Sequence, residues 1–179
     1  MDPRLRPSTV TVPPRIQVAI HEAGHAVVAH ACGVPVVLVT LDAATHKSRF
    51  PSVTRYDPSY TAATPLDHAL IALAGVEAER VAVSQYDRFV ANNIVPPPDD
   101  KAMAKQFLQL AGVSLHEGET QVRPIVEAKL SLVLTVADAL DQCTTLDSAS
   151  FLKLLDAPLS PSEISAVIDR LRMARLQMK

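Results

Sequence analysis

The stretch AIHEAGHAVVAH, residues 19–30, holds two histidines four positions apart. On a helix, residues four apart differ by about 40° of rotation and lie one above the other. His21 and His25 can therefore aim both imidazoles at a single point, as a zinc ion requires. Glu22 stands one position round from His21, close enough to reach a water on that ion without being a ligand. This is the H-E-x-x-H arrangement, in which the glutamate serves as the general base.

Independent signals place a helix around this stretch. Pro13 and Pro14 suit a first helical turn, because proline loses no hydrogen bond there, and Gly33 supplies a C-terminal stop. These residues predict a helix over residues 14–32. Gly24 lies inside it at a cost of roughly 1 kcal/mol relative to alanine, which indicates a close neighbour or a ligand that needs the space. The alternative is a helix with two exposed histidines and a packing glycine.

The remaining elements predict a mainly α (α+β) fold, in which a helical, zincin-like domain carries a small β-sheet. VPVVLVTL (34–41) is β-branched and predicts a strand. FPSVTRY (50–56) is a weaker strand candidate, which Pro51 restricts to an edge. The other helices are expected at residues 65–83, 100–111, 122–142 and 147–156, followed by a last helix that Ser160, Pro161 and Glu163 open as a capping box.

The chain is expected to form one domain over residues 1–179, since this length suits a single core. We divide it into a flexible lead-in at 1–12, a metal-site core at 14–112 and a C-terminal helical bundle at 122–176. The composition, with 48% hydrophobic and 20% charged residues, is that of an ordinary globular protein.

Charge and cysteine usage narrow the class of protein. A net charge of −2 does not provide the excess of positive charge that is typical of proteins that bind nucleic acid or an anionic membrane surface. Cys32 and Cys143 stand far apart and outside any CxxC pattern, which indicates free thiols and a reducing compartment. The first 14 residues lack the apolar run of a signal peptide, and no apolar stretch is long enough to span a bilayer. We therefore expect a soluble, cytoplasmic protein with no membrane segment.

A catalytic zinc site needs a third protein ligand, with the fourth position left open. No histidine stands six residues after His25, so the metzincin continuation is absent. His30 lies about 140° around the helix from His25 and is expected to be a surface or packed residue. No spacing ties the three remaining histidines to the motif, and we expect them to be ordinary polar residues. The full set of candidates comprises Glu77, Glu79, Asp99, Asp100, His46, His68 and His116.

Asp99 and Asp100 follow three prolines and precede a predicted helix, where aspartate commonly caps free backbone N–H groups. Capping is therefore the alternative to a ligand role for either residue. If Asp99 caps, Asp100 is available to coordinate, at a position fixed by the rigid prolines. Glu77 shares a helix face with leucines, where a buried carboxylate would need a partner, whereas Glu79 lies off that face.

Three blocks in order resemble the peptidase domain of FtsH, a zinc protease fused to an AAA+ ATPase. They are HEAGHA (21–26), ALAGVEAERV (72–81) and DDKAMAKQFL (99–108). In that family HEAGHA precedes a GGRAAEEL-like helix and a SNDLxxAT-like segment whose aspartate completes the zinc site. VRPIVEAKL (122–130) and TTLDSASF (144–151) are similar to its C-terminal helices.

The resemblance implies zinc ligands at His21, His25 and Asp100, with Glu22 as the catalytic base. Glu79 matches the first glutamate of the family's helix, which makes it the second choice as ligand. Otherwise Glu77 or Glu79 would orient a histidine from behind.

The chain also departs from the family. It contains no GxxxxGK[ST] sequence, so it has no P-loop, and the GGRAAEEL-like block is only partly kept. ATP-driven unfolding and membrane-protein substrates therefore do not carry over. The family forms rings, but much of that assembly belongs with the ATPase, so a homo-oligomer or a separate partner protein stays open.

The sequence thus predicts a zinc-dependent metalloendopeptidase that cleaves flexible or unfolded polypeptide segments and does not itself use ATP. VVLVTL or SVTRY would offer a strand edge on which an extended substrate pairs through its main chain. The alternative is a non-catalytic or narrowly regulatory metal-binding interaction module that keeps the fold. The intact Glu22 favours the enzyme, because a purely structural site has no need of it.

Overall fold

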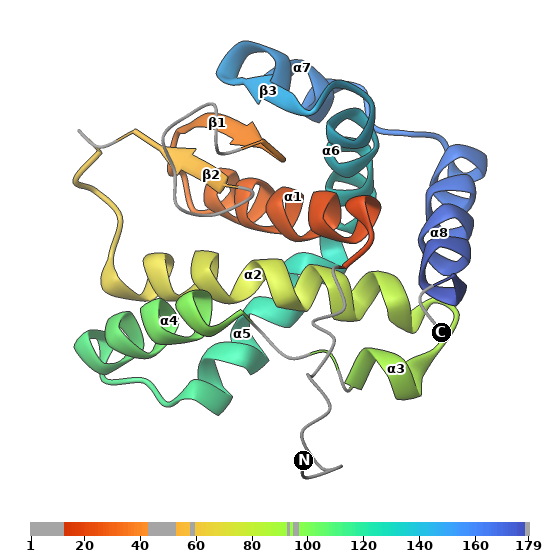
Figure 1. Ribbon diagram of the computed structural model, residues 1–179. Coiled ribbons are helices and arrows are strands. Elements are labelled where there is room, and N and C mark those ends of the chain that lie inside the picture. Colours follow the sequence, from red (N-terminus) through yellow and green to blue (C-terminus); the bar gives the residue numbers. More distant parts are fainter. Residues whose placement is uncertain (1–12, 43–52, 58–59, 93, 95–96, 178–179) are drawn as a thin grey trace, which may run out of the picture.

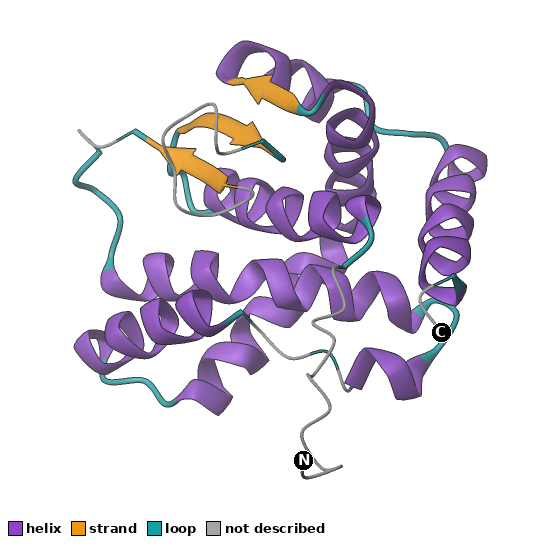
Figure 2. Cartoon of the chain, in the orientation of Figure 1, coloured by secondary structure: helices purple, strands orange, loops and turns teal. Residues whose placement is uncertain are grey.

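The computed structural model describes residues 13–42, 53–57, 60–92, 94 and 97–177 (Figure 1). They form a mainly helical structure with one small antiparallel sheet, as predicted (Figure 2). The N-terminal half contains α1 (Arg15–Ala31), β1 (Val36–Thr40), β2 (Val53–Tyr56), α2 (Pro65–Ser84), α3 (Arg88–Asn92) and α4 (Pro98–Ala111). The C-terminal half contains α5 (Leu115–Ala128), α6 (Leu130–Cys143), β3 (Thr145–Asp147), α7 (Ser148–Asp156) and α8 (Pro161–Leu176).

Helix α1 occupies the middle of the molecule (Figure 1). It packs against α2 on one side, against the sheet on another and against α6 at its N-terminal end. Its residues from Ala19 to Ala29 are buried without interruption, including the polar members of the H-E-x-x-H motif. A motif of charged and polar side chains therefore lies inside the core rather than on a solvent face.

Helix α2 is apolar nearly all round, and the structure buries it nearly all round. Residues Ala69 to Glu79 are all buried, between α1 on one side and α4 and α5 on the other. Thr64 opens the helix with a capping box, in which its hydroxyl accepts from the Asp67 N–H and the Asp67 carboxylate accepts from the Thr64 N–H. The two most buried helices thus lie directly against each other.

The sheet has the strand order β2-β1-β3, so β1 is central and β2 forms one edge. Val39 of β1 pairs with Thr54 on one side and with Leu146 on the other, both antiparallel. The predicted edge position of the second strand is confirmed, while residues 50–52 of that prediction lie outside the described residues. The predicted lead-in at 1–12 also lies outside them.

Four of the predicted helices agree with the structure and one prediction is wrong. The helix predicted over 100–111 corresponds to α4, and that over 147–156 to α7. The helix over 14–32 corresponds to α1, and that over 65–83 to α2. The single helix predicted over 122–142 is two helices, because Lys129 leaves helical geometry at φ −108° and ψ 10°. The first of them begins earlier than predicted, at a capping box in which Ser114 and Glu117 exchange hydrogen bonds. Strand β3 and the short helix α3 were not predicted.

The last helix begins as predicted, with Ser160 and Glu163 in a capping box and Pro161 in the first turn. Cys32 and Cys143 are free thiols, as expected. None of the described helices combines the length and the apolar character that a membrane crossing requires.

Candidate metal centre

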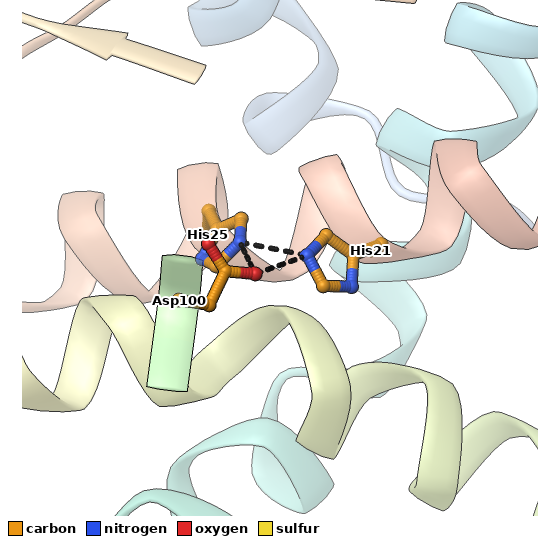
Figure 3. Close-up of side chains that lie close together, drawn as sticks. All are labelled: His21, His25 and Asp100. Carbon is orange, nitrogen blue, oxygen red and sulfur yellow. Dashed lines mark hydrogen bonds and ion pairs between the residues drawn. The ribbon is translucent and has the colours of Figure 1, made fainter. Parts of the chain in front are cut away.

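Helix α1 presents two imidazoles toward one point, as the four-residue spacing predicts (Figure 3). The Nε2 atoms of His21 and His25 lie 3.0 Å apart, and the two residues are 8% and 7% exposed. Each ring is held from behind at Nδ1. The His21 Nδ1 lies 2.7 Å from Glu79 Oε1, and the His25 Nδ1 lies 2.6 Å from the Ile71 carbonyl oxygen. With Nδ1–H donating to these oxygens, both Nε2 atoms are left to face the same space.

Asp100 brings a carboxylate to this space from the first turn of α4 (Figure 3). Its Oδ2 lies 2.8 Å from Nε2 of His21 and 3.5 Å from Nε2 of His25. Pro98 occupies the first helical turn, where proline is well tolerated, and the positive end of the helix dipole favours a carboxylate there. The structure therefore brings together the three residues that the resemblance implies as ligands.

The separations of these atoms fit a small cation with tetrahedral coordination. Metal–ligand distances of about 2.0–2.1 Å place two ligands of a tetrahedral zinc ion roughly 3.3 Å apart. The three atom pairs of His21, His25 and Asp100 are separated by 2.8, 3.0 and 3.5 Å. Adjustments of a few tenths of an ångström would accommodate the ion. Two imidazoles and one carboxylate are also a common donor set of catalytic zinc sites, which leave a fourth position open.

The charges at this centre are strongly coupled. Burial alone lowers the pKa of His21, but hydrogen bonds with Asp100 and Glu79 outweigh burial and raise that pKa from 6.5 to about 10. Burial alone raises the pKa of Asp100, but hydrogen bonds with His21 and His25 outweigh it and hold that pKa well below its ordinary value. A positive charge is thus stabilised at the point where a metal ion would lie.

Gly75 of α2 provides the room for the two rings. A Cβ at this position would lie 2.6 Å from Nε2 of both His21 and His25. Gly24 of α1 has a related role in the contact between α1 and α2. A Cβ there would lie 2.6 Å from Ala78 Cβ and 2.7 Å from the Ala74 carbonyl oxygen. The close approach that Gly24 predicts is confirmed, and the close neighbour is helix α2.

Glu22 is buried beside the histidines and is held by the edge strand. The Thr54 hydroxyl of β2 lies 2.9 Å from Glu22 Oε2 and 3.0 Å from the Glu22 carbonyl oxygen, and it donates to them. Tyr56, two residues further along the same face of β2, lies near this pair. Burial raises the pKa of Tyr56 well above its ordinary value, and the negative charges of Glu22 and Asp100 raise it further, so its phenol stays protonated.

The two glutamates of α2 have different positions. Glu79 contacts His21 from behind, through Nδ1, and is not among the residues grouped around the common point. Glu77 is 2% exposed and pairs with Arg80 through Oε1, as expected of a buried carboxylate, while its Oε2 is buried without a hydrogen-bond partner among the described residues. Of the two residues predicted to orient a histidine, Glu79 makes that contact. The second-ranked prediction of Glu79 as a ligand does not match its position.

The other candidates lie elsewhere. Asp99 is exposed and makes no side-chain cap bond, because Pro97 is the N-cap of α4, so the capping role considered as an alternative for Asp99 is not observed. His68 stacks on Phe107 with ring centroids 4.8 Å apart, and His116 is exposed. His46 lies outside the described residues. His30 is exposed and stands edge-on to Phe151, in agreement with its predicted surface position.

Three residues around this centre were not identified from the sequence: Gly75, Thr54, and Gln17, whose side-chain amide donates to Glu79 Oε2. Gln17 stands four residues before His21, so the same helical spacing that relates the two histidines also marks it. The glycine lies within a block already singled out for its resemblance. Thr54 contacts Glu22 across 32 residues of chain, and no local pattern identifies such a contact.

Compared with models of known protein families, the sequence matches none, and no curated protein sequence matches it either. A functional assignment therefore rests on the geometry of the centre and on the residues that form it.

Proposed function

We propose that this protein is a zinc-dependent metallopeptidase that hydrolyses peptide bonds in flexible or unfolded protein segments. The observation that supports the proposal most directly is the convergence of His21, His25 and Asp100 on one point, with the buried Glu22 beside them. The resemblance of three sequence blocks to the FtsH peptidase domain leads to the same residues.

In this proposal His21, His25 and Asp100 hold the ion. When bound, zinc supplies a Lewis acid that polarises a carbonyl and makes water acidic enough to lose a proton near neutral pH. Glu22 accepts that proton and passes it to the leaving amine, the usual work of a positioned carboxylate. The Thr54 hydroxyl engages Oε2 of Glu22, which orients the carboxylate.

The sheet suggests how a substrate would be held. Strand β1 has a neighbouring strand on both sides, so the edge predicted at VVLVTL is not available. Strand β2 forms an edge of the sheet and carries Thr54, which contacts Glu22. An extended segment paired with β2 would therefore run close to the base, and a folded substrate has no such segment to offer.

The two free thiols, Cys32 and Cys143, agree with a reducing compartment such as the cytoplasm.

The test is a comparison of Glu22→Gln with the native chain. We expect the native protein to bind about one zinc ion per chain, measured by elemental analysis, and to cleave a fluorescently labelled unfolded protein. Glu22→Gln should keep the zinc and the fold and lose at least 100-fold in cleavage rate, because it removes the base and leaves the ligands. Glu127→Gln, at an exposed glutamate of α5, is the matched control and should cleave at the native rate.

Two outcomes would contradict the proposal. Cleavage by Glu22→Gln at the native rate would remove Glu22 from the mechanism. Zinc binding by the native chain without cleavage of any unfolded substrate would favour the alternative, a non-catalytic metal-binding interaction module.

A further inference from the structure

A chain of hydrogen bonds runs from the last helix to the first histidine of the motif. Arg175 of α8 donates from Nη1 to Gln17 Oε1 at 2.6 Å. Gln17 donates from Nε2 to Glu79 Oε2, and Glu79 Oε1 lies 2.7 Å from the His21 Nδ1. This series of hydrogen bonds joins α8, α1 and α2. Its first and last residues, His21 and Arg175, are 154 positions apart in the sequence.

The donor and acceptor types along this chain permit one polarity. A guanidinium only donates, so it must face the carbonyl end of the Gln17 amide. That leaves the NH₂ end of the amide to face Glu79, whose ionised carboxylate only accepts. With Oε2 engaged by Gln17, Oε1 of Glu79 accepts from the Nδ1–H of His21. When His21 gives up the proton on Nε2, as zinc binding requires, its remaining proton stays on Nδ1, and the lone pair of Nε2 faces His25 and Asp100.

These hydrogen bonds are important because the groups that make them are buried or half-buried. Glu79 is 7% exposed and Gln17 and Arg175 are half-buried, so water is a poor substitute for these partners. If Arg175 were absent, the Gln17 amide oxygen would lose its donor, and the side chain would be held less firmly in the position from which its NH₂ reaches Glu79. An orienting carboxylate that lacks its own hydrogen bonds holds a metal-ligating histidine less firmly.

We propose that Gln17 and Arg175 are positioning residues for the metal centre, which act through Glu79 to fix the orientation and the tautomer of His21. The C-terminal helix is thereby part of the site, although Arg175 acts on it only through Gln17 and Glu79. This inference rests on the proposed zinc site but not on the proposed peptidase activity.

The experiment measures zinc affinity, the visible spectrum of the cobalt-substituted protein and the melting temperature of full-length variants. Gln17→Met keeps the length of the side chain and removes both hydrogen bonds, while Arg175→Met keeps the apolar stem and removes the guanidinium. Arg175→Lys is the conservative variant and retains a donor. Arg170→Met is the matched control, because Arg170 lies on the same helix but pairs with Asp138 and Asp141 of α6.

We expect Gln17→Met to weaken zinc binding about 10–100-fold, the range typical of lost orienting partners, and to change the cobalt absorption bands. Arg175→Met should weaken zinc binding less, in the same direction, and Arg175→Lys should recover part of the loss. Arg170→Met should lower the melting temperature while leaving zinc affinity and the cobalt spectrum at native values.

Native affinity and a native cobalt spectrum in both Gln17→Met and Arg175→Met would overturn the inference. An equal loss of affinity in Arg170→Met and Arg175→Met would also overturn it, since the effect would then come from docking of α8. If the native chain binds no zinc, the proposed function fails at its first step, and the inference fails with it. Zinc binding by the native chain without cleavage would leave this test intact.

Discussion

Gly75 fixes how closely helix α2 can pass the two imidazoles of α1. Only a hydrogen occupies the position where a Cβ would lie 2.6 Å from Nε2 of His21 and of His25. These nitrogens are the atoms expected to bind zinc, so a side chain at this position would push against the ligands themselves. Gly24 lies at the same helix crossing, but there the close neighbours are Ala74 and Ala78 of α2.

The prediction at this scale separates the two glycines. Gly75→Ala should weaken zinc binding by at least 10-fold, because the rings must turn away from their common point. Gly24→Ala should instead lower the free energy of unfolding by about 1–3 kcal/mol, the usual cost of overpacking a core. Chelator competition measures the first effect, and urea unfolding of the metal-free protein measures the second.

Gly118→Ala provides the control for a buried helical glycine away from the centre. Its Cβ would meet the ends of the flexible side chains of Leu108, at 2.9 Å, and Leu73, at 3.1 Å, which can shift. We expect native zinc affinity in this variant. Native zinc affinity in Gly75→Ala would mean that the rings are not held where α2 confines them.

At the scale of elements, the first turn of α4 distinguishes two neighbouring aspartates. Asp100 points toward the histidines, whereas Asp99 is exposed and does not cap the helix. Asp100→Ala should therefore weaken zinc binding by more than the 10–100-fold typical of an orienting partner. Asp99→Ala should cost only the interaction of a carboxylate with the helix dipole, about 0.3–1 kcal/mol of stability.

Zinc titration and thermal unfolding of both variants check this prediction. Since the two residues are adjacent, each substitution controls for general disturbance of the turn. Loss of zinc by Asp99→Ala with retention by Asp100→Ala would mean that the ligand is the other aspartate. Retention by both, with loss by Glu79→Ala, would place the third ligand on α2.

The same elements show what the sequence could and could not predict. Helices α1 and α2 were predicted within one residue at each end, because proline, glycine and a long apolar run mark them. Helix α5 was placed too late, although the Ser114–Glu117 capping box marks its true start. The apolar residues of α4 divide between the core and the surface: Ala104 and Leu108 are buried, whereas Met103 and Leu110 are 45% and 67% exposed. The partners of a helix decide which face is buried, and these come from distant parts of the chain.

The residues of the candidate site likewise fall into those that the sequence predicts and those that only the structure reveals. His21, Glu22 and His25 follow from spacing on one helix, and Asp100 was reached through a resemblance rather than through geometry. The contacts of Thr54 with Glu22 and of Arg175 with Gln17 depend on how β2 and α8 dock on α1. Spacing along the chain carries no information on such docking, so the supporting residues of the site emerge only from the whole fold.

At the scale of the whole molecule, the charges of the centre link stability to pH. Without zinc, the folded-state pKa of His21 is about 10 against 6.5 for the ordinary side chain. Its ion pair therefore stabilises the fold fully below pH 6.5, and this contribution is lost as the pH rises toward 10. The pKa of Asp100 is lowered from 3.8, so its contribution is present above that value and is lost as the pH falls below it. The same ion pair underlies both shifts and is counted once.

We expect the metal-free protein to be most stable between about pH 4 and 6.5 and to lose several kcal/mol in free energy of unfolding toward pH 10. Zinc reverses this trend, because it binds the Nε2 of His21 that a proton otherwise occupies. Each unit of pH below about 10 should then cost close to tenfold in zinc affinity through this one proton. Urea unfolding at about pH 5.5, 7.0 and 8.5, with zinc or with EDTA, should show the stabilisation by zinc growing as the pH rises.

His21→Asn is the control for this prediction, since it removes the titrating ring and leaves Asp100 and Glu79 in place. In EDTA, its stability should fall less between about pH 6.5 and 9 than that of the native chain. A native protein whose metal-free stability rises over this interval would contradict the assignment of a charged His21. A stabilisation by zinc that does not change with pH would show that the ion binds without displacing a proton from His21, against the raised pKa of that residue.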